Sequence, residues 1–228
     1  FTFVVGAVDE DETRTDALMV ATMDTKDKTI NVMNIPRDTM CNNTATGASK
    51  KINAAYGMDT GGKGGNIEQM GKEIERLMGF RPDKYVIVNF DGIAAIVDAI
   101  GGVDYDVPFD MKYDDPSQNL HIDLKKGQQH LDGKQTVGFL RWRHNNDYTV
   151  QYTNGDEGRV ENQQKFLKSL AGQVLQIKNV TKIRSIAEAV FKNVKTDFSA
   201  GELLWMGMQA MQIDNSSIQF FTLPGYGK

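Results

Sequence analysis

The stretch YVIVNFDGIAAIVDAIGGVDYDV, residues 85–107, decides the fold class of this chain. Its first six residues form a short apolar run rich in β-branched side chains, which predicts a buried strand. Asp91 stands where it would cap a helix over residues 92–100, and Gly101-Gly102 would end that helix. The last five residues alternate between apolar and acidic, as in a strand with one buried face. A strand, a helix and a strand in this order are typical of an α/β protein.

The same mixture of elements extends in both directions along the chain. The polar residues 24–28 separate two apolar runs and predict a hairpin, whereas residues 111–119 and 145–156 are predicted to be polar loops. Long loops of this kind, without core residues of their own, are often functional. Apolar patterns predict strands over residues 1–8, 17–23, 29–35 and 218–223, and helices over residues 67–78, 158–177 and 181–194, with a further helix capped by Ser199 and Glu202. We therefore predict a single-domain α-β-α sandwich over residues 1–228, with a mixed central sheet and helices on both faces.

The composition excludes several classes of protein. The chain has 228 residues, of which 40% are hydrophobic, and this is enough for a well-buried core. A formal net charge of −4 argues against general nucleic-acid binding, which usually requires a basic face. Cys41 is the only cysteine, so neither an intramolecular disulfide nor a cysteine-based zinc site is possible, and we interpret it as a small loop residue. The Gly-x-Ser-x-Gly, His-Glu-x-x-His and Rossmann glycine motifs are absent from the sequence.

Five of the eight arginines lie in four short polar clusters. The guanidinium group presents a planar fork of donors that matches phosphate oxygens two at a time, so this concentration predicts a site for a multiply charged phosphate. The alternative is a surface ion pair without function for the second cluster, and one structural and one solvated arginine with a hydrogen-bonded structural histidine for the third. The clusters are Arg14-Thr15-Asp16, Pro36-Arg37-Asp38, Arg141-Trp142-Arg143-His144 and Asp156-Glu157-Gly158-Arg159 with Gln163.

The aspartates at the strand ends suggest a hard cation. If the first two strands are neighbours, Asp9 and Asp16 are placed to share one magnesium ion, although both are also ordinary turn residues. Arg159 and Gln163 are four residues apart and share one face of the predicted long helix. Asp156 is placed either to cap that helix or to join the site, and the spacing does not separate these roles.

Taken in order, these clusters and the segments between them resemble the LytR–CpsA–Psr family of bacterial cell-wall enzymes. The resemblance spans nearly the whole chain. The matching segments include Arg14-Thr15-Asp16, Asn34-Ile35-Pro36-Arg37-Asp38-Thr39, Lys51-Ile52-Asn53-Ala54-Ala55-Tyr56, Val88-Asn89-Phe90-Asp91-Gly92, Val97-Asp98-Ala99-Ile100-Gly101-Gly102-Val103-Asp104, Gly127-Gln128-Gln129-His130-Leu131-Asp132-Gly133, the last two arginine clusters and Thr222-Leu223-Pro224-Gly225.

The resemblance implies a phosphotransferase that moves a glycopolymer, such as teichoic acid or capsule, from polyprenyl-pyrophosphate to peptidoglycan. It implies an apolar pocket for the lipid and a position on the extracytoplasmic face of the membrane. A membrane anchor is expected to precede Phe1, because the chain opens inside a predicted strand without an initiator methionine. By resemblance Asp9 and Asp16 hold Mg²⁺, Lys51 borders the site, and the pyrophosphate is bound by Arg14, Arg37, Arg141, Arg143, Arg159 and Gln163. Asp16, Asp38 and Asp156 are alternatives for the base that accepts the hydroxyl proton.

One departure from the family pattern keeps a second function open. Asn162 stands where many members have a further arginine, directly before Gln163. The loss of that charge favours a regulator that binds polyprenyl phosphates without transfer. A polyprenyl-pyrophosphate pyrophosphatase would use the same site with water as acceptor.

Overall fold

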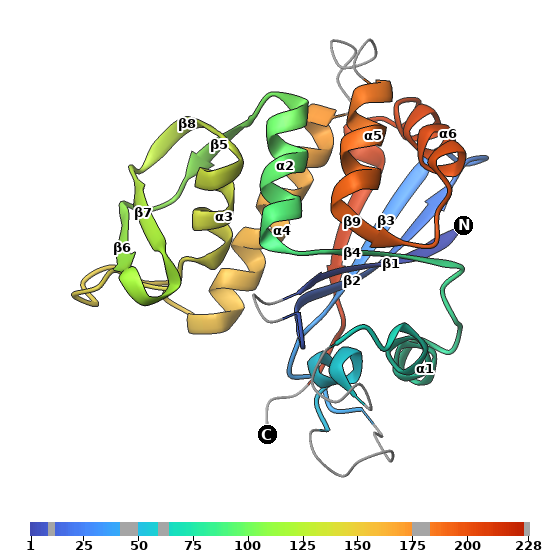
Figure 1. The fold of residues 1–228 in the computed structure, drawn as a ribbon, viewed down its shortest axis with the longest axis horizontal. Helices are drawn as coiled ribbons and strands as arrows, with labels where there is room; N and C mark the ends of the chain where they lie inside the picture. The colour runs from blue at the N-terminus through green and yellow to red at the C-terminus, as the bar shows by residue number, and fades with distance from the viewer. Residues whose placement is uncertain (9–11, 42–49, 59–63, 175–182, 226–228) are drawn as a thin grey trace. The chain divides into compact units, whose positions relative to one another are not determined.

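The structure is a computed structural model that describes the chain except residues 9–11, 42–49, 59–63, 175–182 and 226–228, together with a few side chains in helices (Figure 1). The described chain divides into two compact units. Unit 1 comprises residues 1–92 and 191–228, and unit 2 comprises residues 93–190.

Unit 1 is built on a mixed sheet of six strands in the order β10-β3-β2-β1-β4-β9. The pairs β1–β2, β2–β3 and β4–β9 are antiparallel, whereas β1–β4 and β3–β10 are parallel. The predicted mixed sheet and the predicted hairpin are therefore confirmed. The strands are β1 (Thr2–Val8), β2 (Thr15–Asp24), β3 (Thr29–Ile35), β4 (Lys84–Val88), β9 (Val194–Thr196) and β10 (Ile218–Thr222).

The strand register places several chain reversals at one edge of this sheet. Val8 at the end of β1 pairs with Thr15 at the start of β2, and Leu18 of β2 pairs with Ile35 at the end of β3. Val88 at the end of β4 pairs with Val194 at the start of β9. We call this end of the sheet, where these strands begin or end, the Val8 edge. The segments that follow or precede these residues lie at this end.

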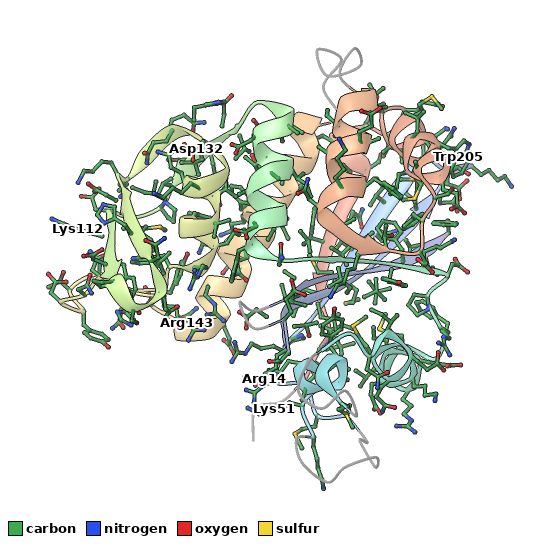
Figure 2. All side chains as sticks on the ribbon, viewed as in Figure 1. Arg14, Lys51, Lys112, Asp132, Arg143 and Trp205 are labelled. Atoms are coloured by element: carbon green, nitrogen blue, oxygen red, sulfur yellow. The ribbon has the colours of Figure 1, made fainter. Side chains whose placement is uncertain are left out.

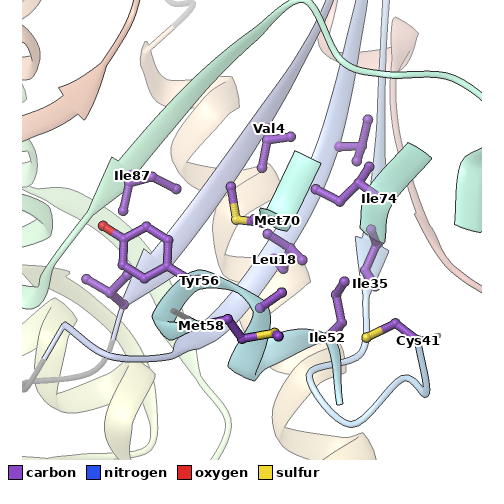
Figure 3. Close-up of a cluster of buried hydrophobic side chains, with 13 residues drawn as sticks. Val4, Leu18, Ile35, Cys41, Ile52, Tyr56, Met58, Met70, Ile74 and Ile87 are labelled. Atoms are coloured by element: carbon purple, nitrogen blue, oxygen red, sulfur yellow. The ribbon is translucent and has the colours of Figure 1, made fainter. Parts of the chain in front are cut away.

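Helices cover both faces of the sheet, as predicted. On one face η1 (Ile52–Gly57) and α1 (Ile67–Met78) pack against β1, β2 and β3, and α6 (Ala200–Ala210) lies on the other (Figure 1). Leu18 is fully buried on the first face against Tyr56 and Met70 (Figure 3). Gly79 ends α1 in the left-handed conformation, at φ 77°, which is the predicted glycine stop.

The described part of unit 2 contains two small two-stranded sheets and four helices, two of them only in part. Its core is formed by buried aromatic rings, with Phe139 and Phe166 both within about 5 Å of Tyr105. The strands pair as β5 (Val103–Val107) with β8 (Gly127–Leu131), and β6 (Met111–Asp115) with β7 (Leu120–Leu124) through η2 (Pro116–Gln118). The helices are α2 (Phe90–Ile100) and α5 (Ile183–Asn193), which continue into unit 1, and α3 (Gly133–Arg141) and α4 (Gly155–Val174).

Several predictions of local structure were wrong. Residues 111–119 are not a loop but contain β6 and η2, because Met111 is fully buried while its charged neighbours face solvent. Asn89, not Asp91, caps α2, since its side chain accepts a hydrogen bond from the Gly92 amide at 2.8 Å. α4 begins at Gly155, so Asp156 lies inside the helix and not at the cap. That residues 1–228 form one domain stays a prediction.

Candidate functional site

Two of the predicted site residues form an ion pair at the Val8 edge. Asp16 is the second residue of β2, and Arg37 follows the end of β3, so the β2–β3 register brings them together. Nη1 of Arg37 donates to Oδ1 of Asp16 at 2.9 Å, and the two side chains keep 28% and 40% of their surface exposed. The hydrogen bond therefore orients the two side chains, and both remain accessible to a ligand.

A second ion pair lies beside the first. Lys51 Nζ is 2.7 Å from Oδ1 of Asp38, with both side chains about half exposed. The backbone amide of Asn53 donates to the carbonyl of Arg37, and a short β-bridge joins Met40 to Lys51. These two contacts hold the start of η1 against the chain after β3. Figure 2 shows Arg14 and Lys51 on the side of unit 1 where η1 lies. Unit 1 therefore gathers Asp16, Arg37, Asp38 and Lys51 within one region.

Arg14 lies on a segment that packs closely against two glycines. A Cβ atom at Gly57 would lie 2.3 Å from the carbonyl oxygen of Thr13, and one at Gly64 would lie 1.7 Å from that of Glu12. Distances this short leave no room for a side chain, so both glycines are required for the approach. The segment that carries Arg14 and leads to Asp16 is thus positioned by backbone contact.

A cluster of three polar side chains holds the other side of this segment: Glu12, Asn89 and Lys195. The sequence did not identify any of the three as a functional residue. The Glu12 carboxylate accepts from Asn89 Nδ2 at 2.9 Å and from Lys195 Nζ at 3.0 Å. These contacts, the one from Lys195 first, lower the pKa of Glu12, and the carboxylate in turn raises the pKa of Lys195. Asn89 lay within a family segment, but nothing in the sequence pointed to Lys195, which is 183 residues from Glu12.

A pocket of about 300 Å³ adjoins this contact at the Val8 edge. Its lining includes the Glu12, Asn89 and Lys195 side chains together with Asp91 and Lys192. Val8, Ile87 and Val194 also line it, so its surface is mixed, and the predicted apolar lipid pocket stays a prediction.

The remaining predicted arginines belong to unit 2. Arg141 is the last residue of α3, and its Nη2 donates to Oε1 of Gln118 at 2.5 Å. Arg143 is exposed and follows Trp142, which is buried. Arg141 is therefore helical, whereas Arg143 lies beyond the end of α3.

Arg159 and Gln163 lie one turn apart on α4, as predicted. Arg159 is only 7% exposed and is the fifth residue of the helix. Gln163 donates its side-chain amide to the carbonyl of Leu140 at 2.9 Å, which joins α4 to the end of α3. Gln163 is therefore anchored to α3, and Arg141 to η2.

The predicted metal site is only partly described. Asp9 and the side chain of Asp156 lie outside the described residues. Asp16 supplies the carboxylate chemistry that a hard cation prefers, but its Oδ1 is engaged by Arg37. In the part of the chain that the structure describes, no three His, Cys, Asp or Glu side chains are grouped as a metal site.

Comparison with known proteins places the chain in a family. The LytR_cpsA_psr family matches residues 4–228. The chain belongs to this family. Its relatives include the polyisoprenyl-teichoic acid–peptidoglycan teichoic acid transferase TagV of Bacillus subtilis, 36% identical over 90% of this chain and 51% of TagV. The regulatory protein MsrR of Staphylococcus aureus is 28% identical over 93% of this chain and 60% of MsrR.

The fold agrees with this membership. The crystal structure of B. subtilis TagV superposes with a TM-score of 0.80 at 31% identity, covering 99% of this chain and 85% of that one. The chain spans about half the length of the curated TagV sequence. Among the described helices of this LytR_cpsA_psr protein, none is both long and apolar enough to cross a membrane.

Proposed function

We propose that this chain is a phosphotransferase that moves a glycopolymer from a polyprenyl-pyrophosphate carrier to peptidoglycan. The observation that carries the proposal is the pairing of Arg37 with Asp16, beside Lys51 with Asp38, at one edge of the sheet. Family membership supports it, because TagV is named as a transferase that joins polyisoprenyl-linked teichoic acid to peptidoglycan.

The chemistry required is attack by a sugar hydroxyl on a phosphodiester. Negative charge then builds on the non-bridging oxygens and on the departing polyprenyl phosphate, and guanidinium groups stabilise both. Arg14 and Arg37 of unit 1 and Arg141, Arg143 and Arg159 of unit 2 are the residues to which we assign this role, with Lys51 and Gln163 as further substrate contacts. Loss of one such donor reduces the rate by roughly 10²–10³ in comparable sites.

The base is one of three carboxylates: Asp16, Asp38 or Asp156. Asp16 and Asp38 already accept charged hydrogen bonds, so each would release its cation partly when it takes up a proton. Magnesium, held by Asp9 and Asp16, would neutralise phosphate charge when bound. We assign the reaction to the extracytoplasmic face of the membrane, with membrane anchoring of the protein and an apolar pocket for the lipid.

A second function is favoured by a specific contact. Asn162 donates its side-chain amide to the carbonyl of Gly158 at 2.9 Å, one turn earlier in α4. The amide is thus turned back onto its own helix and supplies no charge where many family members have arginine. The relative named as the regulatory protein MsrR agrees with a regulator that binds polyprenyl phosphate without transfer. Pyrophosphatase activity is the variant in which water replaces the sugar hydroxyl.

A transfer assay separates these functions. The chain, Mg²⁺, a short synthetic polyprenyl-pyrophosphate disaccharide and peptidoglycan fragments are mixed, and mass spectrometry detects sugar-phosphate on the fragments. The product should be lost in Arg37→Ala and Arg141→Ala. The matched control is Arg81→Ala, since Arg81 forms an exposed ion pair with Glu68 away from the Val8 edge. Lipid retention without turnover supports the regulator, and free sugar-phosphate without adduct supports the pyrophosphatase.

A further inference from the structure

The polar loop between α3 and α4 presents an exposed aromatic ring on a rigid support. Tyr148 is 64% exposed, and its ring stacks on the imidazole of His144 with 4.0 Å between centroids and 19° between planes. The edge of the Tyr113 ring packs against the same imidazole at 5.7 Å. One face of the Tyr148 ring is therefore covered by His144, while most of the ring stays in contact with solvent.

Asparagine side chains hold this loop against β6. Asn145 Oδ1 accepts from the Lys112 amide at 2.7 Å and from the indole of Trp142 at 3.1 Å, and its Nδ2 donates to the Asp110 carbonyl. Asn146 bonds both the amide and the carbonyl of Asp114, at 2.7 and 3.0 Å, as a neighbouring strand would. The loop is thus fixed before any ligand arrives, which lowers the entropic cost of binding.

The backbone of Tyr148 is strained, and local turn chemistry does not account for the residue type. Its φ is 58°, in the left-handed region that glycine or asparagine adopts at little cost. The Tyr148 amide donates to the Asn145 carbonyl at 3.0 Å, so Tyr148 is the last residue of a tight turn. Strain at an exposed bulky residue indicates a site whose function depends on the side chain.

The surroundings of the ring define the class of ligand. The Thr149 hydroxyl donates to the Asp147 carboxylate at 2.7 Å, so polar side chains flank Tyr148 on both sides in the sequence. A lone ring among charges is too small an apolar surface for a lipid, and a net charge of −4 disfavours nucleic acid. A pyranose ring fits, because its C–H face meets the negative face of the aromatic ring while its hydroxyls reach the polar border.

We propose that Tyr148, supported by His144, is a sugar-stacking subsite that binds one ring of a glycan. This rests on the proposed function only for the source of the glycan, which is either the glycopolymer of the donor or the peptidoglycan acceptor. Arg143 directly precedes His144 in the chain, so the subsite follows a residue to which we assign phosphate binding. The subsite would add affinity and selectivity for the sugar and take no part in the chemical step.

The test is a binding titration without turnover. Phosphate-free glycan strands from peptidoglycan, and separately the phosphate-free repeat of a teichoic-acid glycan, are titrated into the protein and followed by saturation-transfer and amide NMR. Tyr148→Asn removes the ring and keeps a residue that tolerates positive φ. It should bind one of the two glycans about three- to tenfold more weakly than the wild type. Tyr148→Phe should bind that glycan nearly as the wild type does.

A matched control is Trp205→Ala, which removes another exposed ring, on α6, and should leave the affinity unchanged. Equal affinity of Tyr148→Asn and the wild type, with unchanged amide dispersion, would overturn the proposal, as would a wild type that binds neither glycan. These outcomes are separable from the proposed function. Glycan binding through Tyr148 without transfer keeps the subsite and removes the transferase, whereas transfer that is insensitive to Tyr148→Asn in both rate and KM does the reverse.

Discussion

Substitution of Gly64 by alanine should separate the position of the Arg14 segment from the stability of the fold. Gly64 has φ 68°, and a Cβ atom there would lie 1.7 Å from the carbonyl oxygen of Glu12. Gly65 next to it has φ 94°, but a Cβ atom at that position has no neighbour within 4 Å. Gly64→Ala and Gly65→Ala therefore carry similar backbone strain and differ in the overlap with Glu12.

The magnitude follows from the contact distance. Carbon and oxygen atoms approach to about 3.3 Å, so Gly64→Ala requires a shift of about 1.5 Å between the two segments. Left-handed alanine costs roughly 1–2 kcal/mol in either variant. A misplacement of about 1 Å at a catalytic segment can cost 10²-fold in rate. Gly64→Ala should therefore lose about 10²-fold in transfer, whereas Gly65→Ala should lose stability with little change in rate.

Thermal melts and the transfer assay at saturating Mg²⁺ measure the two effects. Gly65→Ala should lower Tm by about 2–8 °C, because a domain of this size loses roughly 2–4 °C per kcal/mol. Gly64→Ala should melt lower still. If both variants transfer at the same rate, the Gly64 segment shifts and the Glu12 segment does not. The contact then does not position Arg14. If both melt alike, the close approach to Glu12 is absent in solution.

Three further predictions follow from single contacts. Lys195→Met should lower transfer while costing under about 1 kcal/mol in stability, since the pair with Glu12 is exposed, and Lys195→Arg should restore the rate; transfer assays and melts check this. Asn89→Ala should lower the free energy of unfolding by about 1 kcal/mol, because it removes the cap of α2. Asn89→Asp keeps a cap but places a second carboxylate next to Glu12. The Tm of Asn89→Asp should therefore fall as pH rises above about 4. Burial, with Glu73 nearby, raises the pKa of Cys41 to about 11, so its alkylation near pH 7.5 should be roughly 10²-fold slower in the native than in the denatured protein. The stability due to this neutral thiol is complete below about pH 8.5 and is lost as pH rises towards 11, which Cys41→Ala should not show.

The sequence predicted elements with strong local signals. The hairpin of β2 and β3 follows from two apolar runs around a polar turn, and the predicted capping box of Ser199 and Glu202 is present in the structure. Of the strands described in unit 2, β5 was predicted from its alternating pattern, whereas β6, β7 and β8 escaped prediction. In β6, Met111 is buried while Lys112 and Asp114 are exposed, and so few apolar positions resemble a loop.

The same division applies to the candidate site. Asp16 and Arg37 were both named as site residues, and the register of one hairpin, β2 with β3, brings them together. Glu12 and Lys195 meet only because β9 pairs with β4 and β4 with β1, and no local pattern encodes that register. The resemblance to the family supplied residues of unit 2 that spacing alone left open, and their roles stay predictions.

Left-handed backbone at residues other than glycine shows where side chains matter most. In the described chain these residues are Glu12, Lys28, Asn119 and Tyr148. Asparagine tolerates the conformation, and the side chains of Glu12 and Lys28 bond internal partners, Lys195 and Gln212. Tyr148 keeps most of its ring in solvent although its backbone is equally unfavourable. Stacking on His144 does not require the Tyr148 ring to be exposed, because a buried ring would stack as well. The exposed face is therefore best explained by a ligand that covers it.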